Sequence, residues 1–252
     1  SFYFYFSDLT YNIHVEAINT LLIILSLQMY SARFATKSSI YHCIMQKKCA
    51  IHALLLTKNL LNNFINQKPA PKNMHGGSLI LGLASGIWSA LTLGYGKGDG
   101  EVNEAILARQ SLLLLLVLTN HCTSETNPYR DALFSCCDSQ IESNINTDQV
   151  KGFKIEFAKL YDTLCVTLND DQTTLLLYLL LHRNQHFKSF VLSRSADLHL
   201  IVLPILKILY SSPERNSHHI YMALIILLVL SEDNLFNEYV HDIVSEIITM
   251  NF

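Results

Sequence analysis

Two histidines, His182 and His186, have the spacing that most directly suggests chemistry. Imidazoles four residues apart lie on one side of an α-helix, where they can bind a zinc ion together. The metalloprotease form of this spacing also places a glutamate after the first histidine, whereas Arg183 follows His182 here. The internal repeat described below also places these residues in a turn. We therefore predict no metal site at this pair.

The other candidate groups for catalysis or ligand binding form no recognisable motif. The glycine-rich segment 94–100 lacks the GxxxxGK[ST] spacing of a phosphate-binding loop and follows no predicted strand, so we predict a flexible turn. No serine lies in a GxSxG turn, and most carboxylates stand near predicted helix ends. His218 and His219 point in different directions on a helix, so we expect one to pack and the other to be solvated. The sequence predicts a non-enzymatic protein without catalytic, cofactor-binding or metal-binding residues.

The cysteines favour a reducing compartment. They show no CxxC pair and no disulfide framework, and the chain has no Asn-x-Ser/Thr glycosylation site. We expect buried free thiols and a cytosolic protein. The six cysteines are Cys43, Cys49, Cys122, Cys136, Cys137 and Cys165.

The charge balance argues against a nucleic-acid partner. The formal net charge is −3, and the basic residues are scattered, with Lys47 and Lys48 as the only adjacent pair. Apolar residues make up 50% of the chain and charged residues only 15%, against roughly 25% in typical soluble domains. Much of the surface must therefore be covered by something. We also expect no small-molecule substrate.

The elements that carry these side chains are predicted to be helices. Apolar residues recur at three- and four-residue steps from Leu235 to Ile248, which is one face of an α-helix. Before it, an apolar run spans residues 220–230 and follows Ser212, Pro213 and Glu214. These three residues are typical of a helix start, and together with the length of the run they favour a buried helix over a strand. No segment shows a convincing strand alternation.

Polar and glycine-rich breaks divide these helices. The longest are predicted to be exposed loops at residues 67–77, 94–101 and 138–151. The chain begins at Ser1 without a methionine and stops at Phe252 just after an amphipathic run. We expect residues 1–252 to be a single all-helical repeat region, a fragment of a longer chain.

The chain also resembles itself at an offset of 49 residues. The apolar run 175–181 matches 224–230, the polar turn 182–185 matches 231–234, and the aromatic and aliphatic residues that follow also match. A third copy begins at 112–118, which is 63 residues earlier, and a fainter one at 21–27. Successive helix pairs are typical of armadillo and HEAT repeats. We predict an armadillo/HEAT-like α-solenoid of stacked helix pairs; chance similarity between leucine-rich helices is the alternative.

Residues 78–94 leave a membrane alternative open. Ser78, Gly82, Gly86, Ala90 and Gly94 fall at four-residue steps, which on a helix gives a ridge of small side chains suited to close helix packing. The uncharged stretch is shorter than the roughly twenty apolar residues that span a bilayer. We expect a packed helix here, with an integral membrane protein anchored through residues 78–94 as the alternative.

Several segments together resemble the dymeclin family. In chain order they are GLASGIWSALTLG (82–94), QSLLLLLVLTN (110–120), NPYR (127–130), TLLLYLLLH (174–182), VLPILKILY (202–210) and ERNSHHIYMALIILLVLSEDNLFN (214–237). The resemblance covers most of the chain, and residues 95–108 and 138–151 are the least alike. The last segment is long and particular, which makes the match specific.

The resemblance implies a helical protein of the cytoplasm and the Golgi apparatus. It implies peripheral membrane association, a role in Golgi organisation and vesicle trafficking, and protein partners, with no catalytic residues to transfer. Family members carry a myristoylation signal at the N-terminus, and no Met-Gly start is present here. We therefore expect a scaffold that works through protein contacts, with its membrane anchor outside these residues.

Overall fold

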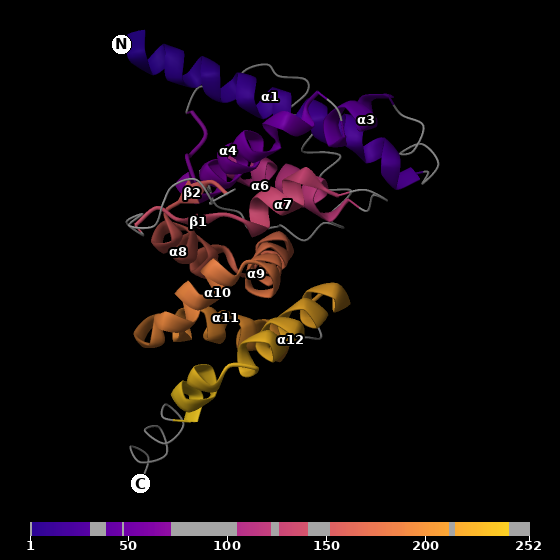
Figure 1. The fold of residues 1–252 in the computed structure, drawn as a ribbon. Helices are drawn as coiled ribbons and strands as arrows, with labels where there is room; N and C mark the ends of the chain where they lie inside the picture. The colour runs from indigo at the N-terminus through magenta and orange to yellow at the C-terminus, as the bar shows by residue number, and fades with distance from the viewer. Residues whose placement is uncertain are drawn as a thin grey trace.

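The chain folds into helices that follow one another from the N-terminus to the C-terminus down the long axis of the molecule (Figure 1). The computed structural model describes residues 2–30, 39–46, 48–71, 105–121, 126–140, 152–211 and 215–241. In the first helix, side chains are described for residues 10–26. The predicted loop 94–101 and the small-residue ridge 78–94 lie outside the described residues.

The fold is all-α, as predicted. The longer helices are α1 (Phe2–Tyr30), α4 (Ala53–Asn66), α6 (Ile106–Asn120), α8 (Phe157–Thr167), α9 (Asp171–Arg183), α11 (His199–Tyr210) and α12 (Ser217–Ser231). The shorter ones are α3 (Ser39–Met45), η1 (Ala50–His52), α7 (Pro128–Phe134), α10 (Gln185–Ser193), η2 (Ser195–Asp197) and a last helix, Asn234–His241. All four apolar runs of the predicted repeat, the fainter one at 21–27 included, are helical.

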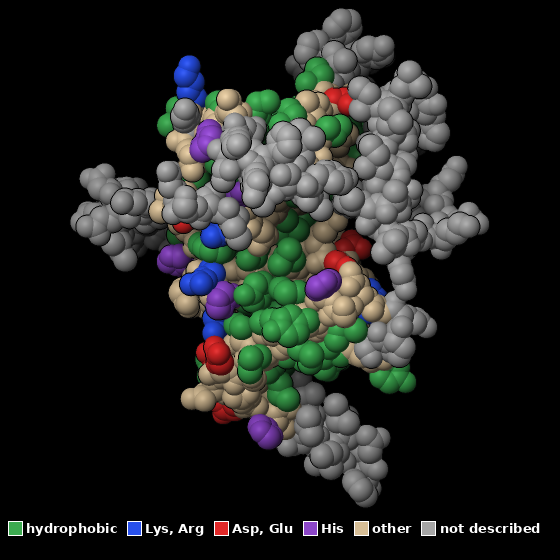
Figure 2. Space-filling view, turned by 90° about the vertical axis from the view of Figure 1, so that its right-hand side faces the viewer, with side chains coloured by type: hydrophobic (Ala, Val, Ile, Leu, Met, Phe, Trp, Pro, Cys, Tyr) green, Lys and Arg blue, Asp and Glu red, His purple; other side chains and the backbone are tan. Residues whose placement is uncertain are grey.

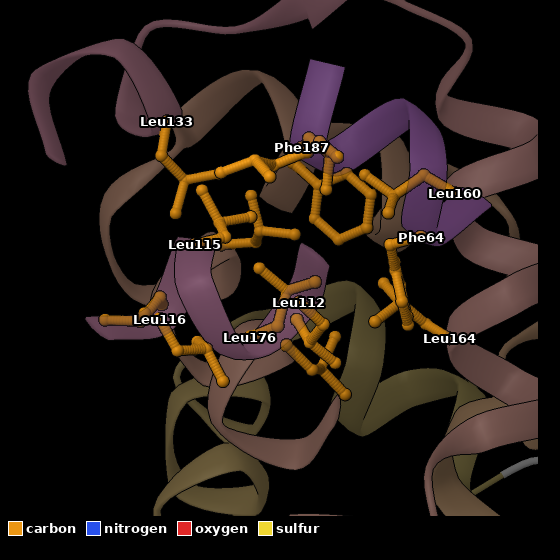
Figure 3. Close-up of a cluster of buried hydrophobic side chains, with 14 of the residues drawn as sticks. Phe64, Leu112, Leu115, Leu116, Leu133, Leu160, Leu164, Leu176 and Phe187 are labelled. Atoms are coloured by element: carbon orange, nitrogen blue, oxygen red, sulfur yellow. The ribbon is translucent and has the colours of Figure 1, made fainter. Parts of the chain in front are cut away.

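Buried side chains from six helices meet in one core (Figure 3). Helix α6 lies at its centre and is apolar almost all round, the pattern of a helix enclosed on several sides. The labelled residues are Phe64 of α4, Leu112, Leu115 and Leu116 of α6, Leu133 of α7, Leu160 and Leu164 of α8, Leu176 of α9 and Phe187 of α10.

The helices pack in two rows that run along the molecule. Helix α6 contacts α9, and α9 contacts α12; in the second row α4 contacts α8, and α8 contacts α11. Figure 1 shows the same progression. The helices α6, α9 and α12, which carry the three clearer copies of the predicted repeat, therefore contact one another in the order in which they occur along the chain. Stacked armadillo- or HEAT-like units remain a prediction that this arrangement fits.

Each of the helices α6, α9 and α12 is followed by a polar cap and a short helix. Asn127 caps α7 by accepting hydrogen bonds from the N–H groups of Tyr129 and Arg130 at 3.0 and 3.1 Å. Asn184 caps α10 in the same way, through the N–H of Phe187 at 2.9 Å. The Asp233 side chain accepts from Leu235 N–H at 2.9 Å at the start of the last helix. Asn184 and Asp233 are 49 residues apart, so the offset found in the sequence matches equivalent caps.

Helix α12 begins later than the sequence signals indicated. Asn216 has an extended backbone and its side chain accepts from His218 N–H at 3.2 Å, so it is the cap and Ser217 the first helical residue. The predicted start signals at Ser212, Pro213 and Glu214 lie outside the described residues, and an asparagine nearer the apolar run takes the capping role.

A short parallel bridge that the sequence did not predict joins β1 (Cys137–Asp138) to β2 (Lys154–Ile155). The N–H of Ser139 donates to Ile155 O at 2.8 Å, which draws together the two sides of the predicted loop 138–151. Gly152 lies so close to this bridge that a Cβ there would stand 1.8 Å from the carbonyl oxygen of Ser135. Glycine is therefore the residue that this approach permits.

The membrane alternative requires a helix that is long and apolar enough to cross a bilayer. Among the described residues, no helix taken alone is both long and apolar enough to cross a bilayer. Two pairs of helices satisfy the criteria only when joined across a sharp bend. They are Gln185–Ser193 with Ser195–Tyr210, bent by 80°, and Ser217–Ser231 with Asn234–His241, bent by 100°.

Candidate contact surface

Helix α11 is apolar on both sides and only one side is buried. Ile201, Ile205 and Ile208 face the core and are fully buried. The opposite side carries Leu203, which is 60% exposed, and Tyr210, which is 91% exposed. Leu200 and Leu206 are exposed on this side as well. A helix with apolar residues all round is normally enclosed, so this outer side has the composition of a contact surface.

Helix α12 repeats this arrangement beside α11, which it contacts. Ala223, Ile226 and Leu230 point inward and are buried. Tyr221, Leu224 and Leu228 occupy the other side at steps of three and four residues and are 64%, 51% and 61% exposed. We call the exposed residues of α11 and α12 together the outer apolar face; its members are Leu200, Leu203, Leu206, Tyr210, Tyr221, Leu224 and Leu228.

The space-filling view shows the distribution of side-chain types over one side of the molecule. In Figure 2, hydrophobic side chains cluster in the lower half of the molecule, and charged side chains lie mainly toward the edges. Lys207 is the charged residue on the exposed side of α11. An apolar centre with sparse charge is typical of the core of a protein–protein interface.

A polar cluster holds α12 against α9 beneath this surface. The buried ring of His219 brings Nε2 to 2.9 Å from the hydroxyl oxygen of Thr174 and Nδ1 to 2.8 Å from Oδ1 of Asp171. The Nδ1 contact does not have hydrogen-bond direction, so we treat it as electrostatic. Arg215, just before α12, donates to the carbonyl of Asn169 at 3.0 Å. These contacts fix the position of α12 relative to α9.

Hydroxyl, imidazole and carboxylate in a row are also the parts of a nucleophilic triad. Thr174 is fully buried, and its oxygen is occupied by the carbonyls of Leu168 and Asp170 as well as by the histidine. A substrate atom would have to displace these contacts inside a packed interface. The arrangement is therefore suited to positioning helices rather than to catalysis.

Replacing Asp171 by asparagine should weaken this junction in a pH-dependent way. Contact with the His219 ring lowers the pKa of Asp171, with partial burial opposing it. A lowered carboxyl pKa gives stability that is complete above the ordinary value near 4 and is lost as the pH falls through the folded value. The side chain is 57% exposed, so we expect Asp171→Asn to cost less than about 1 kcal/mol at pH 7, and progressively less as the pH falls below about 4. Urea unfolding at pH 7 and at a series of pH values below 4 measures the difference.

Asp170 offers the matched control for this experiment. It precedes Asp171 and is the N-cap of α9, a position that asparagine also suits. Loss of solvent around its carboxylate raises the pKa of Asp170, so its charge is unfavourable in the fold. Asp170→Asn should leave stability at pH 7 unchanged or slightly higher. Equal losses from both substitutions would show that the contact with His219 contributes nothing specific.

The histidines of each pair that the sequence singled out lie in different surroundings in the structure. His182 lies in the last turn of α9 and stacks on Tyr178 with ring centroids 5.4 Å apart, whereas His186 is exposed on α10. His219 is buried and hydrogen-bonded while His218 is exposed, which confirms the expectation for that pair. The contact of His219 with Thr174, 45 residues away in sequence, had no signal in the local sequence pattern.

The prediction of buried thiols holds only in part. Cys136 is fully buried, and burial raises the pKa of its thiol to about 12. Four others are only half-buried, namely Cys43, Cys49, Cys137 and Cys165. Cys122 lies outside the described residues. The assumption failed because the apolar composition of the chain says nothing about which side of a helix each thiol occupies.

Comparison with known proteins finds a family that this chain matches. The family model described as "Dymeclin: Dyggve-Melchior-Clausen syndrome protein" matches residues 1–250. The chain is 42% identical to Dymeclin of Drosophila melanogaster and 44% identical to that of Rattus norvegicus, over 96% of its length in each case. It covers 36% and 38% of those two relatives, so it spans little more than a third of their length. Dymeclin of Dictyostelium discoideum is 30% identical over 94% of this chain. No solved structure matches.

Proposed function

The chain belongs to the dymeclin family, and from this premise we propose that it is part of a non-enzymatic scaffold that supports Golgi organisation and vesicle trafficking. The scaffold works in the cytoplasm and at the Golgi apparatus, binds protein partners and associates peripherally with the membrane through segments outside these residues. It takes no nucleic acid and no small-molecule substrate. The outer apolar face of α11 and α12 is the observation that carries this proposal.

The occupant of the outer apolar face is a helix of a partner protein. Helices α6 and α9 are apolar nearly all round, and in each case other helices cover them. The outer face continues the same two rows at the end where α11 and α12 lie (Figure 1). Leu224 and Leu228, four residues apart, provide the ridge that an amphipathic helix packs against.

A photo-crosslinking amino acid at position 228 of the full-length protein tests this contact in cells. A cross-link from position 228 to a second protein, mapped by mass spectrometry to a helical segment of that protein, is the expected result. Val166 is the matched control because it is an isolated apolar residue, 81% exposed, on α8. Cross-linking from 166 should be near background. A product that joins 228 to another part of the same chain, or no product at all, would show that partners do not bind this face.

Charge placed on the face should separate binding from folding. We expect the double substitution Leu224→Glu and Leu228→Glu to leave the thermal unfolding midpoint within about 2 °C, because both side chains are exposed. With the photo-crosslinking amino acid placed instead at position 221 of the same face, where it should also cross-link the partner, the double substitution should abolish that cross-link. Val166→Glu should leave that cross-link unchanged. Equal loss in both variants would indicate a general effect of negative charge.

Membrane association is tested by alkaline carbonate extraction of Golgi membranes. A peripheral scaffold should be released into the supernatant. Retention in the membrane pellet would favour instead the integral protein anchored through residues 78–94.

A further inference from the structure

Cys43 and Cys49 form a pair of neighbouring thiols that no sequence motif predicted. Their Sγ atoms are 3.7 Å apart. Both residues are half-buried, so each retains contact with solvent. A disulfide bond is about 2.05 Å long, and side-chain rotation is the adjustment that would close the remaining distance.

The backbone holds the two residues together independently of the sulfur contact. Cys43 lies in α3, near its end, and Cys49 directly precedes η1. The N–H of Cys49 donates to the carbonyl of Cys43 at 3.1 Å, and the N–H of His52 donates to Cys49 O at 2.9 Å. This turn places both side chains on the same side. The pair is therefore a feature of the folded turn rather than a chance approach of two flexible side chains.

The pair lies beside a buried contact between α3 and α7. The hydroxyl of Tyr129 donates to the carbonyl of Ile44 at 2.9 Å, and Ile44 follows Cys43 directly. Burial raises the pKa of Tyr129 to about 12, and the two nearby thiols add to this effect, so the hydroxyl remains a donor. A covalent link between the thiols would stiffen the turn that supplies this acceptor.

We propose that Cys43 and Cys49 are a reversible disulfide site, oxidised by exchange with a small-molecule disulfide such as oxidised glutathione. One cysteine thiolate attacks a sulfur of the oxidant, which forms a mixed disulfide and releases one glutathione thiolate. The second cysteine thiolate attacks the mixed disulfide at the protein sulfur, forms the bond between residues 43 and 49 and releases the second glutathione thiolate. The two protons lost by the cysteines end on the two glutathione thiols. Two cysteines are oxidised and one disulfide is reduced.

The surroundings of the other cysteines distinguish them from this pair. Cys136 is buried, and the amide of Asn184 donates to its sulfur at 3.2 Å. Burial raises the pKa of Cys165 to about 11, so little thiolate forms there near neutral pH. The contact with Cys43 raises the pKa of Cys49, and exchange at the pair should therefore quicken as the pH rises from 7 to 9.

Peptide mapping of the full 252-residue chain tests the proposal directly. The native protein is incubated with oxidised glutathione at pH 8.5, the remaining thiols are blocked, and the protein is digested with trypsin without reduction. Cleavage after Lys47 and Lys48 separates the two cysteines, so a disulfide between them joins peptides 38–47 and 49–58. We expect this joined peptide to form at least about tenfold faster than any product of Cys136, and to disappear on reduction. Stable glutathione adducts on both cysteines, or no faster reaction than at Cys136, would overturn the proposal.

Two variants test the mixed-disulfide step. In Cys43→Ser, Cys49 has no partner and should accumulate as the mixed disulfide with glutathione. Cys165→Ser is the matched control, and the joined peptide should form at the wild-type rate. If Cys43→Ser still consumed two cysteines per oxidant, a different thiol would be the partner of Cys49 and the proposal would be wrong.

Discussion

Replacing Asn127 by alanine is expected to lower the free energy of unfolding by about 2–4 kcal/mol, the combined scale of a lost helix cap and of buried polar groups left unpaired. The side chain is 4% exposed, and its amide donates to the carbonyl of Leu118 at 2.8 Å while its oxygen accepts from two backbone N–H groups of α7. Arg130 also donates to the carbonyls of Thr119 and His121, so these two carbonyls keep a hydrogen-bond donor in the variant. Urea unfolding followed by circular dichroism measures the loss.

Asn216 is the control that separates burial from capping. It caps α12 from an exposed position, through one bond to His218 N–H. Asn216→Ala should cost only about 0.5–1 kcal/mol, because water can replace the lost acceptor. A similar loss in the two variants would mean that the buried bonds to the end of α6 add nothing to the cap.

Leu176→Ala should cost about 2–5 kcal/mol, the range for truncating a leucine in a well-packed core. Leu176 is fully buried and lies near Leu112 and Leu115 of α6 in the shared core (Figure 3). The cavity would open between two successive helices of the first row. We expect the midpoint of urea unfolding to fall while its slope stays constant, because the surface exposed on unfolding is nearly the same.

The matched substitution on the outer apolar face is Leu228→Ala. Leu228 is 61% exposed, so its truncation removes little buried surface and should change stability by no more than about 0.5 kcal/mol. A loss comparable with that of Leu176→Ala would show that the face is covered within this chain. The pair of variants therefore also tests the surface on which the proposed function depends.

Much of the fold could be predicted from apolar periodicity. Residues 175–181 and 224–230 lie in α9 and α12, which contact each other, and the turn at Asn184 matches the turn at Asp233 as the 49-residue offset required. This succeeded because a long apolar run needs a helix and burial, and because a cap is a local interaction of a side chain with the next two or three N–H groups.

Contacts between distant residues were beyond the sequence. The cluster of His219, Thr174 and Asp171 depends on how α12 is rotated against α9, and a rotation of one residue would turn the imidazole by about 100°. Gly152 gave no signal, because its role comes from the backbone of Ser135 and not from its neighbours in sequence. The thiol pair was missed for the opposite reason, since Cys43 and Cys49 match no known spacing and meet only through the turn between them.

The hydrogen bond between the hydroxyl of Tyr11 and the N–H of Leu107, 3.0 Å long, has a consequence for the order of folding. It joins α1 to α6 across 96 residues, whereas α9, α10 and α11 are separated from their neighbours along the chain by short turns. Closing a long loop costs more chain entropy than closing a short one, and contacts between nearby residues form first. The nucleus should therefore form among α8 to α12, and α1 should dock late. Substitutions at Tyr11 should then mainly accelerate unfolding, while substitutions at Leu176 also slow refolding.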